Sequence, residues 1–271
     1  MSNLQQRVIS AIILAAIVLA LTWVGGMPFR LLAAAIGALV FYEWTTMSDA
    51  AAKDRPLWMA AWILVALALA ALVWGGFGDW ILVASGGVSI AIILFGVMRG
   101  QGGLTGRGML YALLPAIALA GLRGDSMPGL WAIIYLFAVV WATDIFAYFV
   151  GRAVGGPKLA PSISPGKTWS GAIGGAVFAL LAAVAVAFAH GSASPVLLAA
   201  IALPLSAISQ IGDLYESRFK RRFGAKDSSN LIPGHGGVMD RVDGLVAAAV
   251  ALYLGGLVAF GAVGAAQGLF S

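Results

Sequence analysis

The sequence predicts an all-α polytopic membrane protein with about nine transmembrane helices, on the grounds of composition, segment length and charge placement. Of its 271 residues, 61% are apolar and only 10% are charged, whereas a soluble domain carries about 25% charged residues. One soluble core of this size cannot bury so much apolar surface, but a bilayer accommodates it. The chain has no cysteine, which excludes disulfides and thiolate metal sites.

Nine apolar segments approach the length of about 17–25 residues that a helix needs to cross a bilayer. The predicted spans are Val8–Val24, Pro28–Tyr42, Leu57–Trp74, Trp80–Met98, Met109–Leu122, Leu130–Val150, Trp169–Ala189, Pro195–Ile211 and Gly244–Gly264. The first follows Arg7 in the manner of a signal peptide. It shows no small-residue cleavage site and another apolar segment follows at once, so we expect it to be retained.

Basic residues predict the orientation, because cytoplasmic loops carry an excess of Lys and Arg. With nine spans, 14 of the 16 basic residues fall in one alternating set of connections, and only Arg30 and Arg123 fall in the other. This asymmetry predicts a cytoplasmic N-terminus and an extracytoplasmic C-terminus in the inner or plasma membrane of the cell. Adding or removing one span would scramble the alternation, so the count of nine rests on the same observation.

Chemistry-bearing residues concentrate in the second half of the chain. We therefore predict a scaffold of transmembrane helices over residues 1–128 and a catalytic region over residues 129–271, with cytoplasmic loops at 151–168 and 213–243. Gly171 and Gly175 form a Gly-x-x-x-Gly pair that lets helices approach closely. Such pairs usually serve packing within one chain, and a homodimer stays open. The basic residues are not interleaved with aromatic residues, so no nucleic-acid partner is expected.

Four aspartates are the first functional candidates, because ionisable residues in or beside a span are costly. Asp144 lies within the sixth predicted span, Asp213 ends the eighth, and Asp240 and Asp243 begin the ninth. They can meet near the cytoplasmic interface, where Lys and Arg also gather. Carboxylates suit Mg²⁺ and Lys or Arg suit phosphate, so we expect phosphoryl or nucleotidyl transfer involving a lipid. The structural alternative is a basic loop with interfacial salt bridges.

Two stretches resemble a known family. Ser217–Arg221, Lys226–Asp227 and Pro233–Asp243 closely resemble the signature of the phosphatidate cytidylyltransferases. A second stretch also resembles that family, at Asp144, Ala147–Phe149, Gly151–Arg152, Leu159–Pro161 and Ser164–Thr168. The resemblance implies the reaction CTP + phosphatidate → CDP-diacylglycerol + pyrophosphate with Mg²⁺, at an active site facing the cytoplasm. A second, monovalent cation stays open. The expected partners are CTP, phosphatidate and membrane lipid.

Resemblance and position together assign roles to single residues. Asp213 and Asp240 are the predicted metal ligands, and Asp144 and Asp243 are further ligands or orienting groups. The predicted catalytic residues are Asp213, Asp240, Lys226, Arg241 and Lys167, with the three cations stabilising charge on the leaving pyrophosphate. The predicted substrate-binding residues are Ser164, Lys167, Thr168, Ser217, Lys220, Arg221, His235, Gly236 and Gly237.

Several of these residues have structural alternatives. Asp213 and Asp240 would pair with Lys226 or Arg241 in a purely structural role. Ser164, Thr168 and Ser217 would cap helices, and Arg221 would anchor anionic lipid headgroups.

Two other functions compete with cytidylyl transfer. A CTP-dependent polyprenol kinase would transfer the terminal phosphate to a lipid alcohol and would need a base, and the full signature fits it less well. A secondary transporter would use the buried acids to carry protons or cations. Transporters commonly show internal repeats, whereas the charges here are confined to one half of the chain and one face of the membrane.

Overall fold

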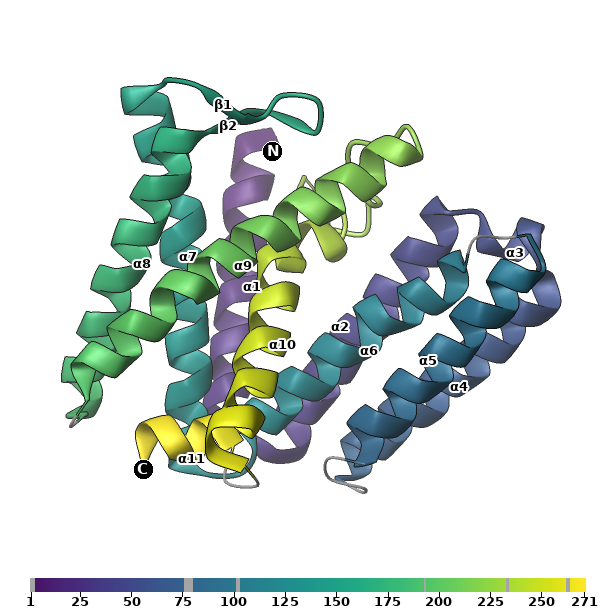
Figure 1. The fold of residues 1–271 in the computed structure, drawn as a ribbon, viewed down its shortest axis with the longest axis horizontal. Coiled ribbons are helices and arrows are strands. Elements are labelled where there is room, and N and C mark those ends of the chain that lie inside the picture. The colour runs from purple at the N-terminus through teal and green to yellow at the C-terminus, as the bar shows by residue number, and fades with distance from the viewer. Residues whose placement is uncertain (1–2, 76–79, 101–102, 193, 233, 262–263) are drawn as a thin grey trace. The chain divides into compact units, whose positions relative to one another are not determined.

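The computed structural model describes residues 3–75, 80–100, 103–192, 194–232, 234–261 and 264–271, and these residues are helical almost throughout (Figure 1). The early helices are α1 (Asn3–Val24), α2 (Gly26–Met47), α3 (Ala50–Lys53), α4 (Arg55–Trp74), α5 (Trp80–Met98) and α6 (Leu104–Arg123). The later elements are α7 (Met127–Val154), β1 (Lys158–Ala160), β2 (Ser164–Thr168), α8 (Trp169–His190), α9 (Pro195–Arg222), α10 (Met239–Phe260) and α11 (Gly264–Phe270).

The chain forms two compact units. The first comprises Met1–Gly124 with Phe223–Arg241, and the second comprises Asp125–Arg222 with Val242–Ser271. The loop between α9 and α10 therefore groups with the early helices, although it follows the later ones in sequence. The predicted division into scaffold and catalytic regions concerns their roles and stays a prediction.

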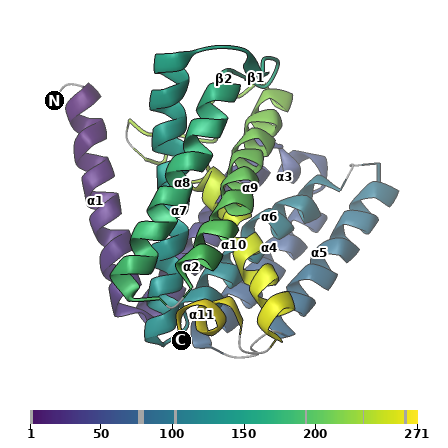
Figure 2. The ribbon, with the colours of Figure 1, turned by 60° about the vertical axis from the view of Figure 1, so that its left-hand side comes forward.

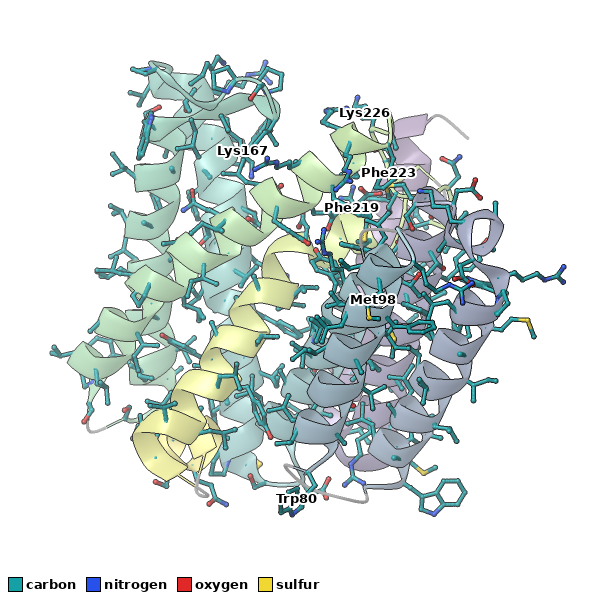
Figure 3. All side chains as sticks on the ribbon, turned by 45° about the vertical axis from the view of Figure 1, so that its right-hand side comes forward. Trp80, Met98, Lys167, Phe219, Phe223 and Lys226 are labelled. Carbon is teal, nitrogen blue, oxygen red and sulfur yellow. The ribbon has the colours of Figure 1, made fainter. Side chains whose placement is uncertain are left out.

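Apolar helices long enough to cross a membrane confirm a multi-pass, all-α protein. Among the described residues, seven helices meet this criterion, namely α2, α4, α6, α7, α8, α9 and α10. The helices α1 and α5 contribute the shorter apolar stretches Ile9–Val24 and Leu82–Met98. Trp80 and Met98, at opposite ends of α5, are 76% and 83% exposed (Figure 3). Each predicted span lies largely within a helix, whereas the number that cross and their direction stay predictions.

The two last long helices differ most from their predicted bounds. We predicted that the eighth span ends at Ile211, but α9 continues to Arg222, and α10 begins at Met239 rather than Gly244. The predicted ninth span also ended at Gly264, whereas α10 ends at Phe260 and α11 follows separately. A hydropathy segment stops at the first charges, although Glu, Lys and Arg are good helix formers. The loop predicted at 213–243 is therefore only the stretch between α9 and α10.

In the second unit, α7, α8 and α9 lie side by side (Figures 1 and 2). The paired glycines of α8 face α7, where a Cβ on Gly171 would lie 2.6 Å from the Ala147 carbonyl oxygen. A Cβ on Gly175 would lie 2.7 Å from that of Thr143. This Gly-x-x-x-Gly pair serves packing within the chain, so it gives no support to a homodimer.

Arg30 and Arg123, the two exceptions to the charge asymmetry, both lie in the first unit, and each contacts the C-terminal end of another helix. Arg123 donates hydrogen bonds to the carbonyl oxygens of Thr22 (2.6 Å) and Trp23 (3.1 Å), which end α1. Arg30 lies against Gly75, the residue that terminates α4. Carbonyl groups at such ends lack intrahelical partners and carry partial negative charge. A basic residue is therefore stabilised there regardless of which side of the membrane it occupies.

The predicted loop 151–168 contains a small antiparallel hairpin rather than irregular chain. Its strands β1 and β2 pair Lys158 with Thr168 and Ala160 with Ser164. The helix α8 starts directly after β2, and Thr168 Oγ1 caps it by accepting a hydrogen bond from the Gly171 N–H (3.1 Å). The hairpin therefore has a rigid connection to the membrane helix that follows it.

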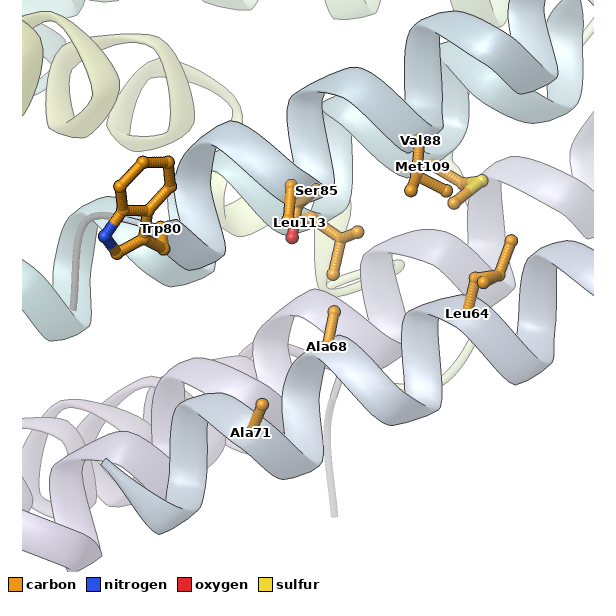
Figure 4. Close-up of a pocket in the computed structure, with 9 residues that line it drawn as sticks. Leu64, Ala68, Ala71, Trp80, Ser85, Val88, Met109 and Leu113 are labelled. Atoms are coloured by element: carbon orange, nitrogen blue, oxygen red, sulfur yellow. The ribbon is translucent and has the colours of Figure 1, made fainter. Parts of the chain in front are cut away.

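The first unit contains an apolar pocket between α4, α5 and α6 (Figure 4). Its volume is about 260 Å³, and Ser85 is the polar residue among its lining side chains, which include Leu64, Trp80, Met109 and Leu113. A lining of this kind offers neither charged groups nor metal ligands, so it does not suit phosphate chemistry.

Candidate active site

The second unit holds a cavity of about 670 Å³ whose lining is polar and charged. This volume lies within the range of about 300–1,000 Å³ typical of ligand pockets. The cavity is bounded by α7, the β1–β2 hairpin, α8, α9 and the first turns of α10. Its polar and charged lining residues are Asp144, Tyr148, Arg152, Lys158, Ser164, Lys167, Thr168, Gln210, Asp213 and Asp243.

Three of the four predicted aspartates come together in this cavity, each from a different helix. Asp144 projects from α7, Asp213 from α9 and Asp243 from α10. Close packing brings the last two together, because a Cβ on Gly212 would lie only 2.9 Å from the Asp243 carbonyl oxygen. Carboxylates that face one another repel, and a nearby cation offsets the repulsion. A positive charge beside these carboxylates is therefore favourable.

Lys167 supplies one such charge. Its Nζ contacts Asp213 Oδ2, and Figure 3 shows the side chain extending from the hairpin toward α9. Ser217 Oγ donates to the other oxygen of Asp213 (3.3 Å). The Lys167 and Asp213 side chains are 28% and 24% exposed, so water screens the pair and its contribution to folding is small. The arrangement leaves both groups accessible to a ligand in the cavity.

The other predicted residues of the second unit divide into two groups. Ser164 and Thr168 line the cavity, and Thr168 also caps α8 as described above. Ser217, Lys220 and Arg221 are outside the cavity lining. The Lys220 Nζ lies 3.0 Å from Oε1 of the fully buried Glu216, and Arg221 is exposed near the end of α9. Lys220 therefore stabilises a buried charge.

The remaining predicted residues, Lys226, His235, Gly236, Gly237, Asp240 and Arg241, belong to the first unit. Asp240 Oδ2 accepts hydrogen bonds of 2.8 Å each from the Ser228 N–H, the Ser228 hydroxyl and the Gly237 N–H. His235 Nδ1 lies 2.9 Å from Ser10 Oγ, and Arg241 Nη2 donates to the His235 carbonyl (2.8 Å). These contacts order the loop that carries the signature, while Lys226 is exposed.

Sequence reasoning missed Glu43 and Gln210. Glu43 is fully buried and accepts hydrogen bonds from the signature loop. The second predicted span ended at Tyr42, whereas α2 continues to Met47, so Glu43 is an acid inside an apolar helix. Its position next to an apolar segment of the sequence could have identified Glu43, because acids inside membrane helices are functional candidates. Gln210 is one helical turn before Asp213 and donates to the Ala172 carbonyl (3.2 Å), but a neutral residue gave no comparable signal.

The oxygen-rich lining fits a hard cation such as Mg²⁺. Within the described part of the chain, no group of three or more His, Cys, Asp or Glu side chains is placed to hold a metal ion. Mg²⁺ does not require one, because it usually takes one or two carboxylates and completes its coordination with water and substrate phosphates. Each of Asp144, Asp213 and Asp243 presents one carboxylate of this kind in the cavity.

Comparisons with known proteins agree with this chemistry. A model of the cytidylyltransferase family matches residues 5–258. The chain is 53% identical to a phosphatidate cytidylyltransferase of Brucella abortus biovar 1 (strain 9-941), over 95% of each chain. It is 39% identical to that of Pseudomonas aeruginosa and 32% identical to that of Bacillus subtilis (strain 168), in each case over 90% of this chain and 94% of the relative.

Proposed function

The chain belongs to the cytidylyltransferase family, and we propose that it condenses CTP with phosphatidate to give CDP-diacylglycerol and pyrophosphate. Relatives of this activity match it over nearly their whole length. The observation that carries the proposal is the cavity where Asp144, Asp213 and Asp243 meet Lys167. Carboxylates and a lysine in one membrane-helix cavity suit a nucleoside triphosphate with its metal, and an apolar lipid tail can remain in the bilayer.

The lipid phosphate is the nucleophile, and it needs no general base. The second pKa of a phosphate monoester is near 6, so phosphatidate is largely dianionic at neutral pH. One of its oxygens forms a bond to the α-phosphorus of CTP, while the bond from that phosphorus to the bridging β-phosphate oxygen breaks. The electron pair leaves with pyrophosphate, so no proton transfer is needed. Positioning and electrostatic stabilisation therefore supply most of the rate.

The protein residues hold the reacting groups in line. Lys167, Lys226 and Arg241 bind triphosphate oxygens and stabilise the charge that develops on pyrophosphate. Asp213 would hold Mg²⁺, with Asp144 and Asp243 as further ligands or orienting groups, and Asp240 of the first unit stays a predicted ligand. Bound Mg²⁺ would supply positive charge to the phosphates. Lys167 contacts Asp213, which supports a shared role for these two residues at one end of the substrate.

The distribution of labelled products tests the reaction. Given CTP labelled at the α-phosphate, phosphatidate and Mg²⁺, the purified protein is expected to move label into lipid and to release unlabelled pyrophosphate. Label found in soluble CDP would instead identify a kinase acting on a lipid alcohol. Absence of nucleotide turnover with any lipid would favour transport. Label transfer that persists after the divalent metal is chelated would contradict the metal-assisted mechanism while leaving the substrates correct.

The proposed topology has nine spans, a cytoplasmic N-terminus and an active site facing the cytoplasm. The charge asymmetry supports it, and both exceptions have structural positions at helix ends. A reporter enzyme that works only in the cytoplasm is expected to be active when fused after Ser229. A reporter that works only outside the cytoplasm is expected to be active when fused after Ser271. The reverse pattern would overturn the orientation, and the same side for both would overturn the count between α9 and the C-terminus.

A further inference from the structure

Glu43 is a buried carboxylate in the first unit that the reaction described above does not use. It lies on α2, its exposed fraction is 0%, and its partners come from the loop between α9 and α10. Oε1 accepts hydrogen bonds from the Ser229 hydroxyl (2.6 Å) and the Val238 N–H (2.8 Å). Oε2 accepts from the Met239 N–H (2.7 Å) and lies 3.1 Å from Ser228 Oγ.

The partners of Glu43 include the first N–H groups of a helix. Val238 and Met239 lie at the start of α10, where N–H groups lack intrahelical acceptors and the helix dipole favours negative charge. Both N–H groups and the Ser229 hydroxyl donate to the Glu43 carboxylate, and the Ser228 hydroxyl lies close to it. Glu43 therefore joins the beginning of α10 and both loop serines to α2, across nearly two hundred residues of sequence.

The same contacts reach Asp240. The Ser228 hydroxyl lies 2.8 Å from Asp240 Oδ2 and 3.1 Å from Glu43 Oε2, so one hydroxyl group lies between the two carboxylates. Gly237 donates its N–H to Asp240 Oδ2 (2.8 Å). A Cβ on Gly237 would overlap Ser228 Oγ and Glu43 Oε1. A side chain at position 237 would therefore displace the Ser228 hydroxyl and the Glu43 carboxylate from these contacts.

We propose that Glu43 is a positioning residue for cytidylyl transfer. It holds Ser228, Ser229, Val238 and Met239 in the positions from which Asp240 and Arg241 act on the substrate. The inference rests on the proposed function, since it gives Asp240 a part in the reaction. It adds a residue from the early helices, outside both stretches that resemble the family signature.

The charge of Glu43 separates this role from simple filling of space. In Glu43→Gln, the side-chain NH₂ replaces one carboxylate oxygen and must face either the Val238 N–H or the Met239 N–H. Neither N–H can accept a hydrogen bond, so both amide orientations are unfavourable. Glu43→Asp keeps the charge but is shorter. A positioning carboxylate therefore predicts the activity order Glu, then Asp, then Gln and Ala together, whereas a packing role predicts that Gln is nearly as good as Glu.

The experiment compares Glu43→Asp, Glu43→Gln and Glu43→Ala with Thr45→Val in the full-length protein. Thr45 is a matched control because it is buried on the same helix and, among the described residues, its hydroxyl bonds to the α2 carbonyls of Phe41 and Tyr42 and not to the signature loop. Two quantities are measured: hydrogen exchange of peptides covering residues 228–240, and kcat and KM for CTP. Glu43→Gln and Glu43→Ala are expected to speed exchange at Val238 and Met239 at least about tenfold and to lower kcat about 10- to 100-fold, the usual cost of losing an orienting group.

Peptides from α8 and the Thr45→Val protein should exchange as in the wild type. Wild-type exchange and turnover in Glu43→Gln would overturn the proposal, and so would fast exchange with unchanged kcat. If Glu43→Gln does not fold, Ser229→Ala removes one donor while keeping the charge and should produce a smaller change in both quantities. If both quantities in Ser229→Ala equal those of the wild type, the proposal is overturned. If the wild-type protein shows no cytidylyl transfer, the proposed function is refuted. The exchange measurement needs no substrate, so it still tests the contacts of Glu43 separately.

Discussion

Asp213→Asn is expected to lower kcat for CDP-diacylglycerol formation by about 10²–10³-fold, the range observed when one charge-stabilising group is removed from an active site. Asn has nearly the same volume as Asp but carries no charge. It still accepts the hydrogen bond from Ser217 (3.3 Å), so the local structure is retained. The lost partner is Lys167, together with any cation held by the carboxylate. Steady-state kinetics of the purified variant give kcat, and thermal unfolding checks that the helices remain intact.

Glu216→Gln is the matched control for that variant. Glu216 is one helical turn further along α9, is fully buried and pairs with Lys220 (3.0 Å), but does not line the cavity. Removing one partner of a buried pair leaves an uncompensated charge and costs stability. We therefore expect Glu216→Gln to unfold more easily while its folded fraction keeps a near-normal kcat. Near-normal kcat in Asp213→Asn would show that the cavity carboxylate is structural.

Lys167→Met is expected to lower kcat about 10²-fold or more, again by loss of a group that stabilises developing charge. Met has a similar length and apolar stem but cannot neutralise phosphate oxygens. Because the Lys167–Asp213 pair is partly solvated, with side chains 28% and 24% exposed, the free energy of unfolding should change by only about 1 kcal/mol or less. Lys167→Arg should recover only part of the activity, since Arg presents a planar fork rather than a compact charge.

A double variant separates two explanations of the lysine. If Lys167 served only to neutralise Asp213, then Lys167→Met with Asp213→Asn would be no less active than Asp213→Asn alone, as coupled residues are not additive. If Lys167 also binds the leaving pyrophosphate, the double variant should show a further rise in KM for CTP. Lys158→Ala is the control, because Lys158 lines the same cavity but is exposed. We expect a smaller effect there.

Part of the candidate site could be predicted from the sequence. Asp144, Asp213 and Asp243 were recognisable because a charge inside or beside an apolar segment is costly. The structure places these three in one cavity, whereas Asp240, which we expected to join them, belongs to the first unit. The roles assigned to them stay predictions. The helix ends were less predictable, since α9 continues through charged residues to Arg222. Hydropathy reports the preference of each residue for lipid, whereas a helix continues as long as its backbone hydrogen bonds can form.

By itself, the sequence determined that this is a helical multi-pass protein. Composition and the length of apolar segments depend on contiguous residues alone, so they can be evaluated without knowing any tertiary contact. The signature that assigns the chain to its family is likewise contiguous. Tertiary structure alone decided that Lys167 meets Asp213 and that Glu43 binds the start of α10. A carboxylate takes whichever donors the folded backbone brings within about 3 Å, and those donors can lie anywhere in the chain. Such pairings follow from packing between distant segments, which no local pattern of residues encodes.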